Sequence, residues 1–229
     1  LYSKFLPLPI PNLSLEENIL EAIAKKDYLL HAPYQNFSYI IKFLREAAID
    51  PKVKSIKITI YRLSKLSDVA SSLINAARNG KKVLVQIELQ ARFDEENNIN
   101  FAGQLEAAGV KLIFGIPGLK VHSKICVIER VGQNKNLRFG FISTGNFNES
   151  TAKIYTDYTL LTADQKILKE VNKVFNFLEV SYKLKKYKHL IVSPHYSANI
   201  LSKLIDNEIS NNKKGLPSGI KLKINNITN

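Results

Sequence analysis

The chain has 229 residues, of which 45% are hydrophobic, so it can bury a core and its composition excludes a disordered tail. Its 33 lysines and arginines outnumber 20 aspartates and glutamates, and the formal net charge of +13 favours a polyanionic partner: nucleic acid, a phosphorylated substrate or an acidic membrane surface. The single cysteine, Cys126, excludes an internal disulfide framework and a zinc ribbon.

The sequence also lacks the marks of a membrane or secreted protein. No apolar run reaches the roughly 20 residues that a spanning helix needs, and the opening residues lack the layout of a secretory signal. We therefore expect a cytoplasmic protein, with peripheral association with a membrane left open. The chain contains no methionine and begins at Leu1, so we expect it to be a fragment of a longer protein.

The first half of the sequence alternates helix and strand patterns. After a proline-rich lead-in, the capping box from Ser14 to Glu17 predicts a helix to about residue 26. Apolar runs predict strands at 27–31, 54–63, 82–89 and 110–115, and the segments between them predict helices at about 37–48, 67–79 and 96–108. Such alternation predicts an α/β fold with a largely parallel sheet covered on both faces.

The pattern changes after residue 115. Two apolar runs, 122–129 and 137–145, flank a short polar loop and predict a β-hairpin. A further strand is predicted at 155–163, and the segment 163–184 has the spacing of a long amphipathic helix.

The last forty or so residues repeat the order of an earlier segment. An apolar run, a proline beside an aromatic residue, a helix pattern, a basic turn and a second apolar run occur in both 29–62 and 190–226. We expect a second structural copy to begin here, although any two strand–helix–strand units look alike. The predicted organisation is a lead-in at 1–26, a first catalytic domain at 27–185 and the start of a second repeat at 186–229.

His122 and Lys124 are the main candidates for chemistry. They lie two positions apart on a predicted strand, so their side chains point to the same face. A lysine cation beside a titratable imidazole in an apolar segment is unfavourable to bury unless an anion lies between them. Neutral imidazole is a nucleophile at neutral pH, and a lysine can offset the charge of phosphoryl oxygens.

The residues that follow extend this pattern. Glu129 lies five positions after Lys124, and Thr144 and Asn146 follow the second hairpin strand. This spacing resembles the HKD signature of the phospholipase D superfamily, with Glu129 in place of its aspartate. The resemblance implies a phospholipase D-like domain with a mostly parallel mixed sheet flanked by helices. Asn146 and Asn148 are candidate hydrogen-bond donors to phosphate, and a purely structural role in the turn stays open for both.

Longer motifs point to a narrower family. The stretches "TIYRLS", "ELQARFDEENNI", "GIPGLKVHSK" and "STGNFNESTAKIYTDYTLLT" resemble, in this order, the first catalytic C-terminal domain of the polyphosphate kinase family. The resemblance implies that His122 becomes phosphorylated, that Tyr155 contacts the nucleotide, and that Arg62 and Arg92 belong to the magnesium and phosphate site.

The resemblance also implies a reaction and its partners. It implies an enzyme, ATP:polyphosphate phosphotransferase, which moves the terminal phosphate of ATP reversibly to polyphosphate through a phosphohistidine, with Mg²⁺ bound to ATP. A guanidinium has no lone pair, so Arg62 and Arg92 can grip phosphate oxygens but cannot be direct metal ligands. No direct protein ligand for the metal is predicted. The expected partners are ATP, ADP and polyphosphate, without nucleic acid, and the full-length enzyme is expected to be an oligomer.

Two other functions stay open at this point. A phosphodiesterase or nuclease of the phospholipase D kind shares the His–Lys chemistry but hydrolyses its substrate. A basic nucleic-acid-binding module would use the charge alone. Because most of a second repeat is missing from the sequence, we expect the chain by itself to be inactive or very weak as a kinase and to expose apolar surface.

Overall fold

The computed structural model describes residues 6–61, 67–88, 95–116, 118, 120–180 and 186–222. The chain divides into two compact units, Leu1–Lys185 and Lys186–Asn229, which are treated separately below. The lead-in belongs to the first unit, where Ile10 and Leu13 are buried in the core.

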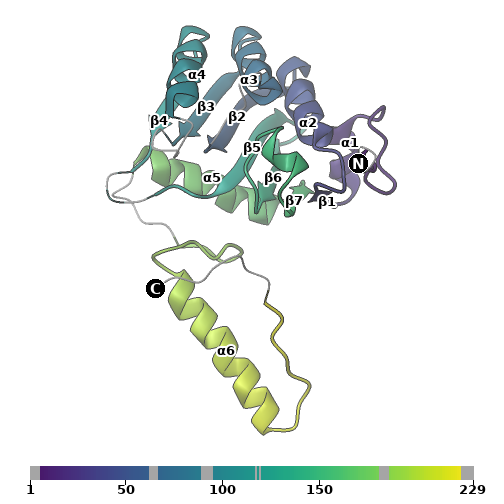
Figure 1. Ribbon diagram of the computed structural model, residues 1–229, viewed down its shortest axis with the longest axis vertical. Coiled ribbons are helices and arrows are strands. Elements are labelled where there is room, and N and C mark those ends of the chain that lie inside the picture. The colour runs from purple at the N-terminus through teal and green to yellow at the C-terminus, as the bar shows by residue number, and fades with distance from the viewer. Residues whose placement is uncertain are drawn as a thin grey trace, which may run out of the picture. The chain divides into compact units, whose positions relative to one another are not determined.

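The first unit is built on one seven-stranded sheet in the order β1-β7-β6-β5-β2-β3-β4 (Figure 1). The strands predicted for this unit are all present, with boundaries that move by a few residues. They are β1 Tyr28–Ala32, β2 Val53–Ile60, β3 Lys82–Ile87, β4 Lys111–Phe114, β5 Lys124–Val131, β6 Asn136–Ser143 and β7 Asp157–Thr162.

The strand directions differ from the prediction in one respect. Only the pairs β2–β3 and β3–β4 are parallel, whereas β2–β5, β5–β6, β6–β7 and β1–β7 are antiparallel. The sheet is mixed, as predicted, but the expectation that it is mostly parallel is wrong. The physical reason is that the chain leaves β4 at the edge and returns to the other side of β2, with no helix among the described residues of that connection. Apolar patterning reports burial of a strand, and it does not report strand direction.

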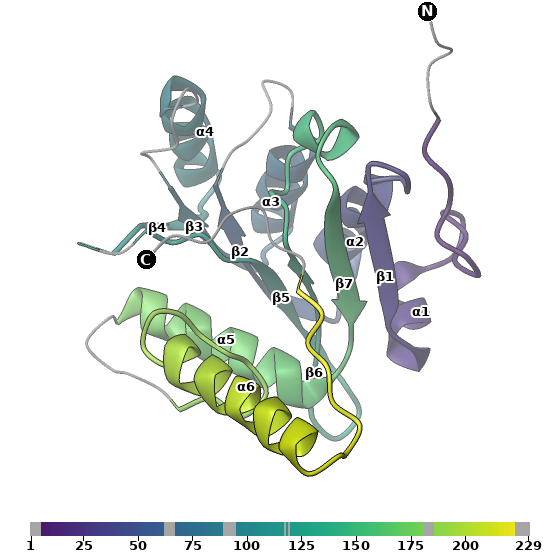
Figure 2. The same cartoon turned by 60° about the horizontal axis from the view of Figure 1, so that its bottom comes forward.

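Helices cover both faces of this sheet (Figures 1 and 2). One face carries α1 Ile19–Lys25, α2 Ser38–Ile49, α3 Asp68–Arg78 and α4 Glu95–Ala107, and the other carries α5 Gln165–Glu179. On the first face Phe43 of α2 packs edge-on against Phe141 of β6, with ring centroids 5.1 Å apart. On the other face Leu168 of α5 lies over Gly140, where a Cβ atom would also collide with the carbonyl of Cys126. Gly140 therefore allows close packing of strand and helix.

Helix α1 begins one turn later than predicted. Asn18 is its N-cap, and its side chain accepts a hydrogen bond from the amide of Glu21 at 2.8 Å. The Ser14–Glu17 pair does form contacts, but as a turn before the helix, with the amide of Ser14 donating to Glu17 at 3.4 Å. The prediction that the helix starts at Ser14 is wrong because Asn18 and Glu21 offer the same capping pattern four residues later.

A buried carboxylate of α2 accepts hydrogen bonds from the first turn of α1. Glu46 is 8% exposed and accepts hydrogen bonds from the amides of Ile19 and Leu20, at 3.0 and 3.1 Å. Its carboxylate also forms an ion pair with the ammonium of Lys42 at 3.0 Å. The carboxylate satisfies first-turn amides that no residue inside the helix can reach and lies at the positive end of the helix dipole. One α2 side chain thus connects the first turn of α1 to α2, in addition to the buried apolar residues of α1.

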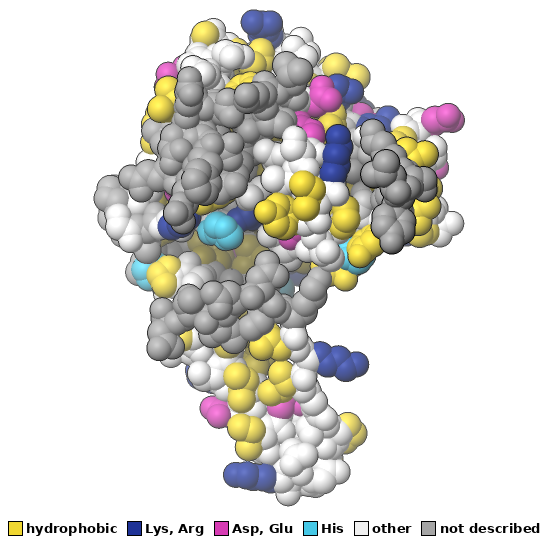
Figure 3. Space-filling view, in the orientation of Figure 1, with side chains coloured by type: hydrophobic (Ala, Val, Ile, Leu, Met, Phe, Trp, Pro, Cys, Tyr) yellow, Lys and Arg dark blue, Asp and Glu magenta, His cyan; other side chains and the backbone are white. Residues whose placement is uncertain are grey.

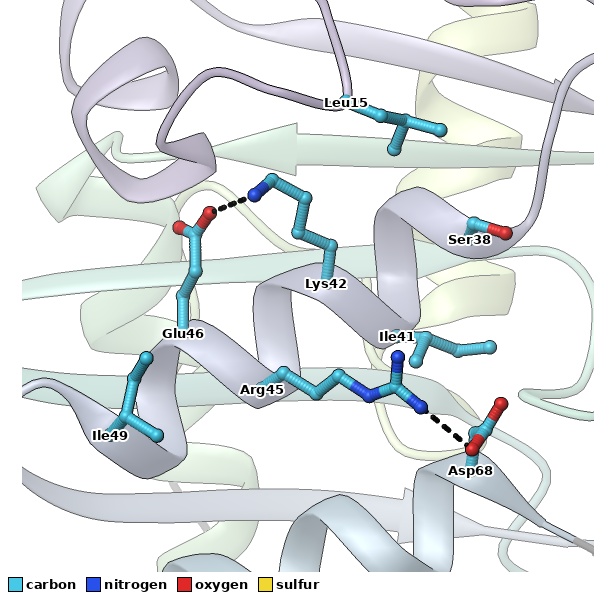
Figure 4. Close-up of a pocket in the computed structure, with 8 residues that line it drawn as sticks. All are labelled: Leu15, Ser38, Ile41, Lys42, Arg45, Glu46, Ile49 and Asp68. Carbon is cyan, nitrogen blue, oxygen red and sulfur yellow. Dashed lines mark hydrogen bonds and ion pairs between the residues drawn. The ribbon is translucent and has the colours of Figure 1, made fainter.

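Glu46 also lines a surface pocket of about 400 Å³ on the outer side of α2 (Figure 4). The other lining residues include Leu15 of the lead-in and Asp68 at the start of α3, which pairs with Arg45 at 2.8 Å. No candidate catalytic residue among those that the structure describes lines this pocket.

The second unit contains one long helix, α6 Ser197–Lys213. No residue of α6 is buried, and its apolar side chains are exposed at Leu201, Leu204, Ile205 and Ile209. Figure 3 shows hydrophobic side chains on the surface of this helix. A helix is present where the sequence predicted one, whereas the second repeat itself stays a prediction. The strand expected at 190–192 is not formed, since a strand needs a hydrogen-bonded neighbour and the described residues of this unit contain no other strand.

Across the parts of the chain that the structure describes, no helix combines the length and apolar character needed to cross a bilayer.

Replacement of Glu46 by alanine tests the link between α1 and α2. We expect Glu46→Ala to weaken the anchoring of α1 by about 1–3 kcal/mol, because two buried amides lose their acceptor. Amide hydrogen exchange at Ile19 and Leu20 measures this as faster exchange. Glu106→Ala, at an exposed position of α4, is the control, and unchanged exchange in Glu46→Ala would contradict the assignment.

Candidate phosphoryl-transfer site

Five strand ends meet at one edge of the sheet. Because β2 and β5 are antiparallel, the end of β2 lies beside the start of β5, and the parallel pairing of β2 with β3 brings the end of β3 to the same edge. Lys124 at the start of β5 is paired with Ser143 at the end of β6, which in turn is paired with Thr159 near the start of β7. Residues that precede β5 or follow β2, β3 and β6 are thereby brought together.

His122 and Lys124 lie at this edge in different environments. The strand begins at Lys124, so His122 lies in the preceding segment and not within the strand as the sequence suggested. Lys124 is 5% exposed, whereas His122 is exposed. The ammonium of Lys124 donates a hydrogen bond to the backbone carbonyl of His122. A buried cation thus supports an accessible imidazole two residues away.

Thr59 of β2 fixes the backbone on both sides of Lys124. Its hydroxyl donates to the carbonyl of Ser123 at 2.7 Å and accepts from the amide of Ile125 at 3.0 Å. Thr59 is 2% exposed, and its bond with the Ile125 amide is buried, whereas its bond with the Ser123 carbonyl is partly buried. The local strand pattern of the sequence could not identify this role, because Thr59 is more than sixty residues away from its partners.

Tyr61, one residue after β2, contacts the same group. Its ring lies 5.4 Å from that of His122, at 75°, and the ammonium groups of Lys120 and Lys124 lie 5.2 and 5.5 Å from its centroid. Sequence reasoning missed Tyr61 and Lys120, although both lie within motifs that carried the family resemblance.

The electrostatic setting keeps the imidazole neutral. Partial burial, followed by the charges of Lys124 and Lys120, lowers the pKa of His122 below its usual 6.5. Burial also lowers the pKa of Lys124 to about 8, while the carboxylate of Asp157 acts in the opposite direction and Lys120 adds to the decrease. Near neutral pH the pair therefore consists of an uncharged imidazole and a cationic lysine, the protonation states that attack on a phosphoryl group needs.

Asp157 at the start of β7 is held in place by the end of β6. Its carboxylate accepts a hydrogen bond from the Thr144 hydroxyl at 2.8 Å, and that hydroxyl also accepts from the amide of Tyr158 at 3.0 Å. A Cβ atom at position 145 would collide with the Asp157 carboxylate, so Gly145 leaves the space that the carboxylate occupies.

The two asparagines behave differently. Asn148 is buried, and its side-chain oxygen accepts from the amides of Ser150 and Thr151 at 2.9 and 3.0 Å, which is a structural role in the turn. The side-chain oxygen of Asn146 is buried and accepts no hydrogen bond within the described part of the chain. Asn146 is therefore the asparagine with unused hydrogen-bonding capacity.

The remaining candidates are scattered. Tyr155 is 62% exposed and follows the short 3-10 helix η1 Thr151–Lys153, two residues before β7. Glu129 lies toward the opposite end of β5, where its carboxylate pairs with Arg138 of the neighbouring strand at 2.7 Å, so the structure does not bring it to His122. Arg62 and Arg92 lie outside the described residues.

Within the described residues there is no group of three or more His, Cys, Asp and Glu side chains arranged to hold a metal ion. Magnesium binding therefore stays a prediction.

Comparisons with known proteins show the family of the chain. The model of the family "Polyphosphate kinase C-terminal domain 1" matches residues 18–184, which include the whole sheet, His122 and Lys124. The chain belongs to this family. The resemblance found in the sequence is thereby confirmed, whereas the roles of individual residues stay predictions.

Relatives of the chain are considerably longer. A polyphosphate kinase from Escherichia coli K12 is 51% identical over 210 residues, which are 92% of this chain and 30% of the relative. The crystal structure of a polyphosphate kinase from Porphyromonas gingivalis matches with a TM-score of 0.81 at 39% identity and covers 91% of this chain and 35% of that one. The chain thus spans about a third of the length of the curated relatives that it matches.

The phospholipase D likeness concerns the fold. Nuc from Salmonella typhimurium, a phospholipase D family member, matches with a TM-score of 0.52 at 15% identity over 66% of this chain and 91% of its own. This likeness and the mixed sheet flanked by helices confirm the predicted phospholipase D-like α/β fold.

The Thr59 bridge can be tested by removing its hydroxyl. We expect Thr59→Val to destabilise the start of β5 by about 1–3 kcal/mol, because Val fills the space but leaves the Ser123 carbonyl and the Ile125 amide without their partner. Faster hydrogen exchange at the Ile125 amide would report the change. Thr156→Val, at an exposed position, is the control, and equal exchange in the two variants would contradict the role given to Thr59.

Proposed function

We propose that this chain carries the phosphohistidine step of a polyphosphate kinase. The imidazole of His122 attacks the terminal phosphorus of ATP, a nitrogen–phosphorus bond forms, the bond to the bridging oxygen breaks, and ADP leaves. The terminal oxygen of polyphosphate then attacks the phosphorus of phospho-His122, which frees the imidazole and lengthens the polymer by one unit. The same steps in reverse return the phosphoryl group to ADP.

The exposed His122 imidazole beside two lysines is the observation that carries this proposal. Phosphoryl transfer requires mainly positioning and stabilisation of charge on the oxygens around phosphorus. Lys120 and Lys124 supply positive charge beside the nucleophile, and both lower the pKa of His122. The cost of burying the Lys124 ammonium is offset in part by Asp157, so its charge remains available near neutral pH.

The other predicted residues have roles that follow from their chemistry. Arg62 and Arg92 would bind phosphate oxygens, since guanidinium groups match them in geometry and charge. Tyr155, largely exposed, would contact the nucleotide. Magnesium would arrive with ATP and neutralise negative charge on its phosphates. ATP and polyphosphate, both polyanions, account for the formal net charge of +13, and the need for ATP implies a cytoplasmic reaction.

Radiolabel transfer tests the proposal directly. The native full-length protein that contains this chain is incubated with Mg²⁺ and ATP labelled at the terminal phosphate, as wild type, as His122→Gln and as the control His195→Gln. We expect acid-labile, base-stable label on the wild type and the control and none on His122→Gln. The isolated chain, lacking most of the length of its relatives, is expected to make little or no polyphosphate.

The competing activity, hydrolysis of phosphodiesters, is measured in parallel with bis-p-nitrophenyl phosphate and without ATP. It is considered because Nuc shares the fold and this chain has the His–Lys pair. Cleavage of this ester by an enzyme that takes up no label would replace the kinase proposal by a hydrolase.

The pKa of Lys124 predicts how the rate depends on pH. Its ammonium loses a proton as the pH rises through about 8, so transfer should slow above that pH, and Lys124→Arg should remove this limb of the profile. On the acid side the rate should fall only below the lowered pKa of His122.

The stability of the fold changes with pH in the opposite direction. Between about pH 8 and 10.5 the unfolded chain binds more protons at Lys124 than the folded chain, so folding becomes more favourable as the pH rises. A rate of transfer that stays constant from pH 7 to 10 would contradict the role given to the Lys124 ammonium.

A further inference from the structure

The ring of Tyr61 is the common neighbour of the nucleophile and both lysines. It meets the His122 ring nearly perpendicularly at 5.4 Å, and the ammonium groups of Lys120 and Lys124 lie over it at 5.2 and 5.5 Å. These three residues come from the segment that precedes β5 and from its first residue, whereas Tyr61 directly follows β2. The contacts therefore connect two parts of the chain through one side chain.

The physics of these contacts is specific to an aromatic ring. A perpendicular ring pair places the positive edge of one ring against the negative face of the other, which favours one orientation of the imidazole. The negative face of Tyr61 also attracts cations, most strongly where they are shielded from water, as Lys124 is at 5% exposure. An aliphatic side chain of similar size would fill the space and provide neither interaction.

We propose that Tyr61 is a positioning residue for the phosphoryl-transfer reaction: its ring orients the His122 imidazole and holds the ammonium groups of Lys120 and Lys124 beside the phosphoryl group. This inference rests on the function proposed above and assigns Tyr61 a role in it. Tyr61 acts through its neighbours and does not itself touch the reacting atoms.

The groups around Lys124 predict how the pH dependence of the rate changes when the Tyr61 ring is removed. Asp157 acts on Lys124 from β7, Lys120 acts from the preceding segment, and Tyr61 lies against it from the end of β2. Removing the ring takes away one stabilising neighbour of the ammonium, leaving the Asp157 carboxylate, the His122 carbonyl and the repulsion from Lys120. The alkaline limb of the rate should therefore move to lower pH. Loss of packing alone would reduce stability without moving this limb.

The test compares Tyr61→Phe, which keeps the ring, with Tyr61→Leu, which removes it, in the native full-length protein. The rate of His122 phosphorylation by ATP is measured in single-turnover experiments from pH 6 to 10. We expect Tyr61→Phe to retain the wild-type profile. In Tyr61→Leu we expect a rate about ten- to a hundredfold lower at pH 7, because the nucleophile is misoriented. We also expect the midpoint of the alkaline limb to lie about half a pH unit to one pH unit lower.

Matched variants keep the result interpretable. Tyr34→Leu, at a half-exposed tyrosine between β1 and α2, is the control for loss of a tyrosine ring elsewhere. If Tyr61→Leu does not fold, Tyr61→Met fills a similar volume without a ring and takes its place. Equal effects of Tyr61→Phe and Tyr61→Leu would assign the effect to the hydroxyl and overturn the inference.

The two proposals can fail separately. An unchanged rate and pH profile in Tyr61→Leu, alongside normal labelling of the wild type, would overturn the role of Tyr61 alone. Absence of label on the wild type would overturn the proposed function itself. A lower rate in Tyr61→Leu without a shift of the alkaline limb would mean that Tyr61 contributes packing alone. That result would likewise overturn the inference.

Discussion

The antiparallel pairing of β2 with β5 is the constraint on which the candidate site depends. Ile58 lies opposite Cys126, and this register brings Thr59 and Tyr61 beside a segment some sixty residues later. The strands are held by buried apolar residues on both faces, so a shift of one position would expose a set of core side chains to water. The core of the sheet therefore determines the placement of His122, although His122 is not part of the core.

The site balances two opposing demands on its lysines. Burial of Lys124 makes its charge energetically unfavourable, yet the proposed phosphoryl transfer requires that charge. Asp157 and the ring of Tyr61 each stabilise the buried ammonium, which offsets part of its desolvation free energy without neutralising its charge completely. The imidazole benefits from the same arrangement, because neighbouring cations keep it unprotonated and hence nucleophilic.

Local patterns predicted the local features well. Every strand of the first unit and the hairpin of β5 and β6 follow from apolar runs and turn residues, and His122 and Lys124 were recognised from their spacing. Strand direction was not predictable, because a buried strand has the same composition whichever way it runs. The roles of Thr59 and Tyr61 depend on tertiary contacts, which no window of sequence contains. The start of α1 was misplaced because two equivalent capping patterns stand one turn apart.

The close approach of Gly145 to Asp157 has a consequence for how this domain can vary during evolution. Any side chain at position 145 would occupy the space of the carboxylate, and any loss of the carboxylate would alter the charge balance at Lys124. Substitutions at the two positions are therefore not independent. Among descendants of this sequence, a larger residue at 145 should become tolerable only after residue 157 has become smaller, and the intermediate sequence would have Lys124 without its counter-charge.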